Sequence, residues 1–262
     1  MLAREVSERV VIEQAVAEVV GPPPPSGTRE MFAHHLRRRG EAVTAADKPK
    51  YWRELKARPE LKDTPVYGAD GPQSQAVLKV IKPILDLYGR VWDVAVIEQD
   101  EPFAGAFRQC IFIVSTGLLH LVTDEELRGF VAHELAHECF IEELREADRS
   151  HCASAYRLVE YKSDLVGALA LLLACGDPLA LATGVEKVEA YYLRSNPSVL
   201  RDDTHPDSTH RRRCIELFLT RIKEAGVLTL GIHYFEGASA IGWLRPDYSS
   251  LPDRLESSRP IN

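Results

Sequence analysis

The sequence predicts a mainly helical α+β fold in which a small β-sheet borders one buried helix. Two observations support this class. Apolar residues recur at helical spacing in several segments, most clearly over residues 124–140 and 153–174. Residues 91–97 and 109–115 are instead short runs rich in Val and Ile, which predict strands. With 45% apolar residues in 262, the chain can bury a sizeable core.

The first residues predict a helix and a linker that precede the main domain. Residues 1–20 mix charged residues with apolar ones at helical spacing, and residues 21–27 (GPPPPSG) predict a stiff extended linker. The expected apolar face of the first helix consists of Val6, Val10, Val16 and Val20. Further helix-like segments follow at residues 31–39, 48–58 and 75–88, the last interrupted by Pro83.

The next helix has a clear start signal. Thr123 can cap it while Glu126, three residues on, returns the hydrogen bond, so the helix should begin near Asp124. Its apolar residues at helical spacing are Leu127, Phe130, Val131, Leu135 and Cys139. We therefore expect a core helix that holds its remaining side chains rigidly.

This helix contains the pentapeptide His133-Glu134-Leu135-Ala136-His137. Residues four apart lie one above the other on a helix, so both imidazoles can reach one metal ion. Glu134 then faces the water that the metal activates, an arrangement typical of zinc peptidases. The alternative is that both histidines are ordinary core or surface residues and that Glu134 is a solvated neighbour.

A catalytic zinc site needs a third protein ligand and an open position. The class with a third His six residues after the motif is excluded, because that position is Glu143. We favour Glu160, on the helix predicted over residues 153–174, with Asp164 one turn later accepting the second ring proton of a zinc-bound His. The competing ligands are Glu142, Glu143, Glu146 and His151.

A third group of polar residues surrounds His205-Pro206. The proline favours an extended or turn conformation at His205, and Ser208 or Thr209 can cap a helix over residues 211–222. From this loop, His205 could hydrogen-bond the tetrahedral intermediate, or it could enter the fourth zinc position and keep the protein latent. An ordinary turn is the alternative. Tyr161 and Tyr156 are further candidates for a donor to the oxyanion.

Three motifs together resemble a known family. The segments HELAH at 133–137, EYKSD at 160–164 and THPDSTHR at 204–211 occur in the order seen in the HtpX, CAAX prenyl protease and OMA-type zinc metallopeptidases, and residues 113–127 resemble the strand and helix start that precede the motif there. The resemblance covers about residues 75–225. It implies a zincin-like (gluzincin) fold and one Zn²⁺ per chain, with these roles: ligands His133, His137 and Glu160; general base Glu134; supporting partner Asp164; and His205 and Arg211 near the site.

The chain departs from this family in two places. Many members carry an Asn-Ala-Phe segment on the strand that faces the substrate, whereas residues 101–107 here lack the Asn. The interval from His137 to Glu160 is short, without the membrane-spanning segments that others insert. We therefore expect a minimal, soluble member, with residues 1–28 as helix and linker and residues 29–262 as the metallopeptidase domain with a C-terminal tail.

Composition limits the partners and the compartment. A net charge of −7 argues against a nucleic-acid partner. No apolar run approaches the roughly 20 residues that span a bilayer, and the N-terminus lacks the apolar core of a signal peptide. Five Cys, an odd number without close pairs, suit a reducing compartment, so the expected localisation is cytoplasmic.

These observations predict a zinc-dependent metalloendopeptidase that hydrolyses extended or unfolded polypeptides. The strand predicted over residues 109–115 is expected to border the cleft and to pair with the substrate backbone. The alternative is a noncatalytic or latent zinc-bearing module of the same fold that binds peptides.

Overall fold

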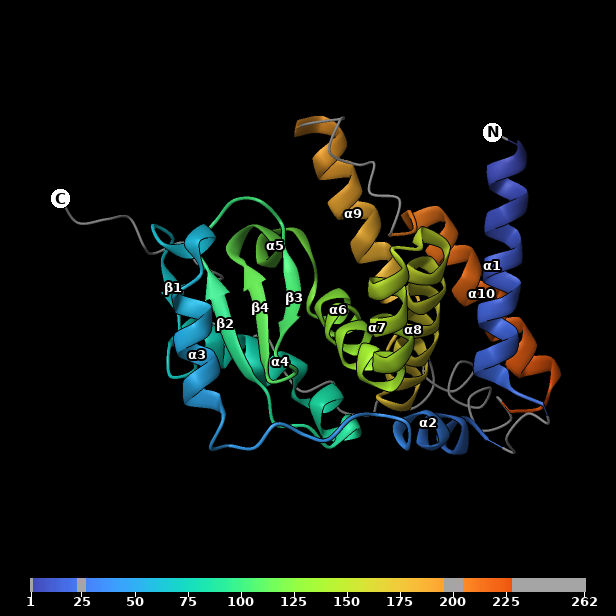
Figure 1. The fold of residues 1–262 in the computed structure, drawn as a ribbon, viewed down its shortest axis with the longest axis horizontal. Helices are drawn as coiled ribbons and strands as arrows, with labels where there is room; N and C mark the ends of the chain where they lie inside the picture. Colours follow the sequence, from blue (N-terminus) through green and yellow to red (C-terminus); the bar gives the residue numbers. More distant parts are fainter. Residues whose placement is uncertain (1, 23–26, 196–204, 228–262) are drawn as a thin grey trace, which may run out of the picture.

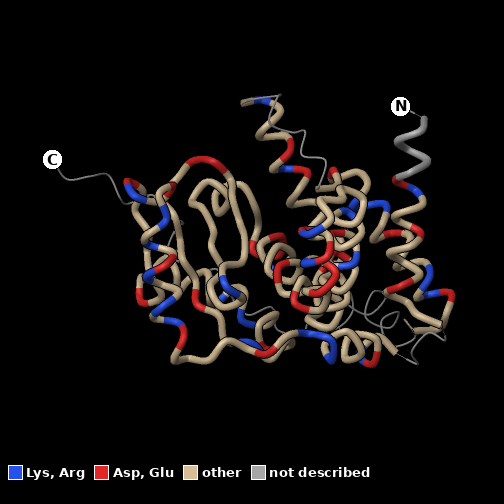
Figure 2. The backbone as a smooth tube through the Cα atoms, in the orientation of Figure 1, with Lys and Arg blue, Asp and Glu red and all other residues tan. Residues whose placement is uncertain are grey.

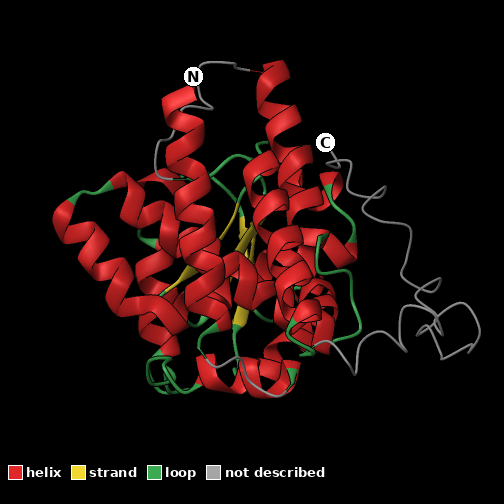
Figure 3. Cartoon of the chain, turned by 90° about the vertical axis from the view of Figure 1, so that its right-hand side faces the viewer, coloured by secondary structure: helices red, strands yellow, loops and turns green. Residues whose placement is uncertain are grey.

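The computed structural model describes residues 2–22, 27–195 and 205–227. It confirms the mainly helical α+β class, since helices surround a small four-stranded sheet (Figures 1 and 3). The α-helices are α1 (Leu2–Val20), α2 (Thr28–Leu36), α3 (Lys48–Lys56), α4 (Pro72–Tyr88), α5 (Thr116–Leu121), α6 (Asp124–Ala136), α7 (Ile141–Ser150), α8 (Ala153–Leu173), α9 (Ala180–Ser195) and α10 (Ser208–Glu224). The strands are β1 (Val66–Tyr67), β2 (Asp93–Ile97), β3 (Ala104–Phe107) and β4 (Ile111–Ser115), and the 3₁₀ turns are η1 (Pro59–Leu61) and η2 (His137–Phe140).

The sheet has the order β1-β2-β4-β3, with a parallel pair β2–β4 flanked by antiparallel outer strands. One face packs in the main core with α4, and the other packs with Leu55 of α3. The expectation that residues 109–115 border the cleft is wrong, because β4 is an interior strand and β3 is the edge strand beside α6. The pattern did not predict β3, since Ala-Gly-Ala-Phe lacks the β-branched residues that favour strands.

Helix α6 begins as predicted. Thr123 Oγ1 accepts a hydrogen bond from the Glu126 backbone N–H, and Glu126 Oε2 accepts one from the Thr123 N–H at 2.7 Å, which completes a capping box. Leu127, Val131 and Leu135 are buried. The helix ends at Ala136, and η2 follows directly. The HELAH side chains therefore lie on the last turn of α6 and on the first residue of η2.

Two glycines let other helices approach α6 closely. A Cβ on Gly167 of α8 would lie 3.2 Å from the Ala132 carbonyl carbon and from the His133 nitrogen. A Cβ on Gly129 of α6 would lie 2.6 Å from the Leu181 nitrogen of α9, which no side chain could accommodate without a shift of backbone. Helix α8 therefore crosses α6 beside the HELAH motif, and α9 crosses it nearer its beginning.

The N-terminal helix α1 packs against α8 and α10. Its predicted apolar face is partly wrong: Val10 is 57% exposed, whereas Ile12 and Val19 are buried beside the expected Val16. Because α1 packs against both α8 and α10, its buried face does not include Val10. Two carboxylates also tie α1 to α8, because Glu8 pairs with Arg157 and Glu18 pairs with Lys162.

Helix α10 starts three residues earlier than predicted. Asp207 is its N-cap, in place of Ser208 or Thr209, and accepts a hydrogen bond from the His210 N–H at 2.9 Å. The Ser208 side chain instead donates to Glu189 of α9, which also accepts from the Ser208 N–H. The expected C-terminal tail lies outside the described residues from residue 228 on.

Charged residues of both signs are interspersed along most helices (Figure 2). Strands β3 and β4 contain none. In the described part of the chain, no helix combines the length and the apolar character needed to cross a membrane.

Candidate metal centre

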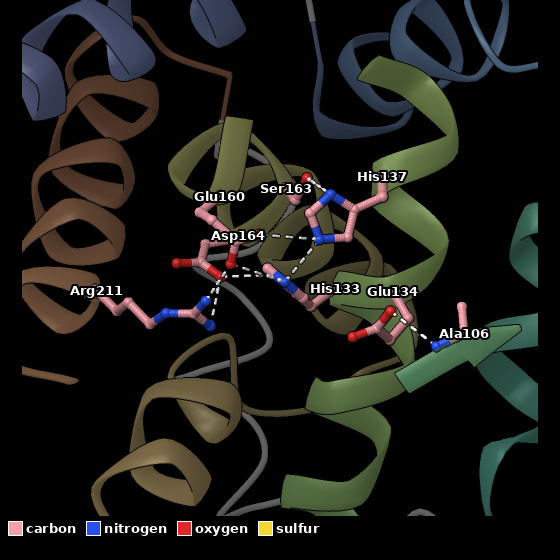
Figure 4. Close-up of polar contacts among 8 residues, drawn as sticks. All are labelled: Ala106, His133, Glu134, His137, Glu160, Ser163, Asp164 and Arg211. Carbon is pink, nitrogen blue, oxygen red and sulfur yellow. Dashed lines mark hydrogen bonds and ion pairs between the residues drawn. The ribbon is translucent and has the colours of Figure 1, made fainter. Parts of the chain in front are cut away.

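Three side chains from two helices converge at one point. His133 lies in the last turn of α6, His137 begins η2 one turn later, and Glu160 reaches them from α8 (Figure 4). The Nε2 atoms of the two histidines are 3.0 Å apart. Glu160 Oε2 lies 3.4 Å from His133 Nε2, and its Oε1 lies 3.3 Å from His137 Nε2.

These spacings fit a metal ion of the size of zinc. Nitrogen and oxygen ligands lie about 2.0–2.2 Å from tetrahedral zinc, so any two of them are about 3.3–3.6 Å apart. The observed separations of 3.0 to 3.4 Å lie close to that range. Within the described ranges, this is the one group of three His, Cys, Asp or Glu residues that could hold a metal ion.

Each imidazole has a polar neighbour on its far nitrogen. Asp164 Oδ1, fully buried, lies 2.8 Å from His133 Nδ1, as the sequence predicts. Ser163 Oγ lies 3.1 Å from His137 Nδ1. No sequence pattern singled out Ser163, although it stands one position before Asp164 on the same helix. Such neighbours fix the ring orientation and leave Nε2 directed at the common point.

A buried guanidinium closes the far side of the cluster. Arg211 of α10, only 5% exposed, donates to Glu160 Oε2 at 2.5 Å and to Asp164 Oδ1 at 3.2 Å (Figure 4). Burial alone would lower the pKa of Arg211, but Asp164 and Glu160 raise it. One cation, which neither helix α6 nor α8 supplies, thus contacts both carboxylates.

The ionisable groups influence one another strongly. Burial would lower the pKa of His133, but Glu160 and Asp164 raise it to about 10. Burial and the neighbouring charge of His133 lower the pKa of His137 to about 3. Burial would raise the pKa of Glu160, yet His133 and His137 hold it below its usual range. The carboxylates therefore favour positive charge between the three donor atoms, which a divalent cation would supply.

Glu134 points from α6 toward the edge strand. Its Oε2 accepts a hydrogen bond from the Ala106 backbone N–H of β3 at 3.1 Å (Figure 4). Burial raises the pKa of its carboxyl group, against the lowering effect of His133. A carboxylate of raised pKa beside a metal-binding cluster is suited to accept and return a proton.

The competing ligands are engaged elsewhere. Glu142 and Glu146 of α7 pair with Arg145 and Arg149, and Glu143 pairs with Arg38 and Lys162. His151 is exposed at the end of α7. The structure thus brings Glu160, and none of these four residues, to His133 and His137.

The other proposed donors differ in position. Tyr161 is buried and its hydroxyl donates to Glu8 of α1, while Tyr156 donates to Asp148 of α7, so neither is directed at the cluster. Tyr161 follows Glu160 directly and therefore lies on another side of α8. His205 is exposed in the loop before α10 and is among the groups that lower the pKa of His137.

Comparison with known proteins gives a family match over part of the chain. No curated protein matches the chain. The family match begins with α4, covers β2, β3, β4, α5 and α6, and ends with η2, so it includes HELAH and stops before Glu160. Over these residues, 72–140, the chain matches the sequence model of peptidase family M48.

Proposed function

We propose that the protein is a zinc-dependent metalloendopeptidase that hydrolyses extended or unfolded polypeptides. The observation that carries the proposal is the convergence of His133, His137 and Glu160 beside a carboxylate, Glu134, that contacts an edge strand. Bound there, zinc would lower the pKa of a water molecule to about 7 and polarise the peptide carbonyl.

Strand β3 supports an extended substrate. It is the edge of the sheet and consists of Ala104-Gly105-Ala106-Phe107. Exposed edges are usually protected by charged residues or Pro, and β3 has neither. A peptide added to this edge would bind mainly through its backbone, which suits cleavage within polypeptides of varied sequence.

The side chains around the cluster would divide the work. Glu134 would take a proton from the attacking water and deliver it to the leaving amine. Asp164 and Ser163 would hold the imidazoles of His133 and His137. Arg211 would keep Glu160 ionised and fixed, and so acts as a positioning residue.

His205 is our candidate for the donor that stabilises the oxyanion. Its exposed position near His137 leaves it accessible to a substrate. Loss of one such donor typically lowers kcat about 10²- to 10³-fold. His205→Ala should therefore reduce turnover without reducing the zinc content, and unchanged hydrolysis would exclude this role.

The function is tested by measuring zinc content and casein cleavage together for wild type, Glu134→Gln and a control. Glu142→Gln is a matched control, because it removes a carboxylate from an exposed position on α7. We expect one zinc per chain in all three proteins and cleavage by wild type and the control only. Zinc in wild type without cleavage would favour a latent or noncatalytic peptide-binding module. Absence of zinc from wild type would overturn the proposal.

A further inference from the structure

An aromatic side chain, Phe103, is exposed immediately before the edge strand. Phe103 is 45% exposed, yet its backbone is fixed by hydrogen bonds. The Phe103 N–H donates to Ser115 Oγ at 2.8 Å, and its carbonyl accepts from the Ser115 N–H at 2.9 Å. The preceding carbonyl of Pro102 accepts a hydrogen bond from the Tyr192 hydroxyl of α9 at 3.2 Å. The ring is therefore presented to solvent from a rigid base.

The ring lies across Gly105. A Cβ at Gly105 would be 3.3 Å from Phe103 Cζ, and no other residue lies within 4 Å of that position. Alternate residues of a strand share a face, so Phe103 and Gly105 are on the same side of the sheet. Phe103 thus covers the place where residue 105 would otherwise carry its own side chain.

The hydrogen-bonding pattern shows which groups face the free edge. Phe103 is bonded to Ser115 of β4, and Gly105 is paired with Ile113. In an antiparallel ladder the bonding direction alternates, so the backbone groups of Ala104 and Ala106 point outward. The bond from the Ala106 N–H to Glu134 agrees with this direction. A peptide added to β3 would pair through these two alanines, and at Ala106 it would replace Glu134 as the partner of the backbone N–H.

The peptide residue opposite Gly105 would be a close, non-hydrogen-bonded neighbour, with its Cα about 4.5 Å away. Its side chain would project on the face shared by Gly105 and Phe103. Because Gly105 has no side chain, that group would meet the Phe103 ring directly. The same peptide residue adjoins the one opposite Ala106, where Glu134 is located.

We propose that Phe103 is a specificity-determining residue, whose ring receives an apolar or aromatic side chain of the peptide residue paired with Gly105. The inference rests on the proposed function, in that it assigns a side-chain preference to the same peptide-binding edge. Cross-strand contacts between an aromatic ring and an apolar side chain correspond to about a three- to tenfold gain in affinity.

Val91 is an exposed apolar residue that does not share this position. Val91 is 81% exposed, but it lies just before β2, which β4 separates from β3. It serves as the control for a general effect of removing surface apolar area.

The test measures peptide binding separately from hydrolysis. In the zinc-treated full chain with Glu134→Gln, fluorescence anisotropy would compare two labelled extended peptides that differ only in carrying Phe or Ser at one central position. We expect the Phe peptide to bind about three- to tenfold more tightly. Phe103→Ala should abolish this ratio, whereas Phe103→Trp and Val91→Ala should retain it. An unchanged ratio in Phe103→Ala, or no preference in the Glu134→Gln parent, would overturn the inference.

Cleavage sites in casein supply the second readout. Wild type should cut at sites enriched in apolar residues at one fixed distance from the scissile bond, and Phe103→Ala should lose that enrichment, with a raised KM for peptides that carry those residues. If both proteins cut at identical sites, the specificity role of Phe103 would be rejected, whereas the proposed peptidase activity would stand. A Phe preference in binding that depends on Phe103, together with no cleavage by wild type, would preserve this inference and reject the peptidase.

Discussion

Helices α6 and α8 contribute to the metal centre in different ways. Helix α6 and the first residue of η2 carry two ligands and the base within five consecutive positions, after a helix start signal that the sequence itself contains. Helix α8 contributes Glu160, Ser163 and Asp164, all buried, and its carboxylates depend on Arg211 from a third helix. The α6 side lies within the family match and the α8 side lies beyond it. Local sequence therefore determines which donor groups the HELAH motif offers, whereas the packing of α8 decides whether they form a metal centre.

The largest effect is expected when the cation on the α8 side is removed. Arg211→Met leaves Glu160 and Asp164 buried without their partner, which should lower the free energy of unfolding by about 3–5 kcal/mol. Urea denaturation of the metal-free protein would measure the loss. Added zinc should restore much of it, because the metal supplies positive charge to the same carboxylates.

A second buried pair gives the control for this prediction. Arg90, between α4 and β2, and Glu138, in η2, are 5% and 2% exposed, and neither is among the three residues that could hold a metal ion. Arg90→Met should destabilise the protein by a similar amount, about 3–5 kcal/mol, without any zinc-dependent recovery. Equal recovery by zinc in both variants would contradict the specific link between Arg211 and the centre.

The next effect concerns the ligand from α8. Zinc sites with four protein ligands bind with about 10–16 kcal/mol, so each ligand contributes roughly 3–4 kcal/mol. Glu160→Gln should therefore weaken zinc binding about 10²- to 10³-fold, measured by competition with a chromophoric chelator. Glu142→Gln should bind zinc like wild type. If Glu160→Gln also bound zinc like wild type, His133 and His137 would hold the metal without a ligand from α8. The difference inferred between the two helices would then be wrong.

A histidine outside the centre provides the pH dependence. His35 of α2 is buried with its Nε2 3.0 Å from the Val19 carbonyl, and burial lowers its pKa from 6.5 to about 4. Between these values the unfolded chain binds a proton that the folded chain does not, so stability falls as the pH decreases from 6.5 to 4. The loss should reach about 3 kcal/mol.

The same experiment separates the fold from the metal centre. His35→Gln should flatten the pH dependence of the unfolding free energy over that interval, with zinc affinity at pH 7.5 unchanged. A retained slope in this variant would show that other groups cause the acid sensitivity.

The smallest effect is expected from the serine on α8. Ser163→Ala removes the partner of His137 Nδ1 and should weaken zinc binding about tenfold. Ser163→Thr, which keeps the hydroxyl, should restore affinity, and Ser154→Ala, at the exposed beginning of α8, should have no effect. Equal zinc affinity in Ser163→Ala and wild type would limit the α8 contribution to its carboxylates.

Local patterns predicted the parts of the molecule that local interactions determine. The capping box at Thr123 and the apolar spacing of residues 124–140 are short-range features, and the structure has both. The helix of Glu160 was predicted for the same reason, and the periodicity placed Glu160 and Asp164 on one face.

Features set by packing between distant segments were not predictable in this way. Strand β3 is extended because it pairs with β4, despite a sequence without β-branched residues. The contact of Ser163 with His137 depends on how closely Gly167 lets α8 approach α6. The direction of Tyr161 was misjudged because adjacency in sequence does not give adjacency in space on a helix.

The most direct test of the account is the position of the metal in a crystal of the zinc-treated protein, located by anomalous scattering at the zinc edge. We expect one strong peak about 2.0–2.2 Å from His133 Nε2, His137 Nε2 and a carboxylate oxygen of Glu160. A peak held by the two histidines with Glu142, Glu143, Glu146 or His151, or no peak beside the histidines, would contradict the claim that α8 completes the centre.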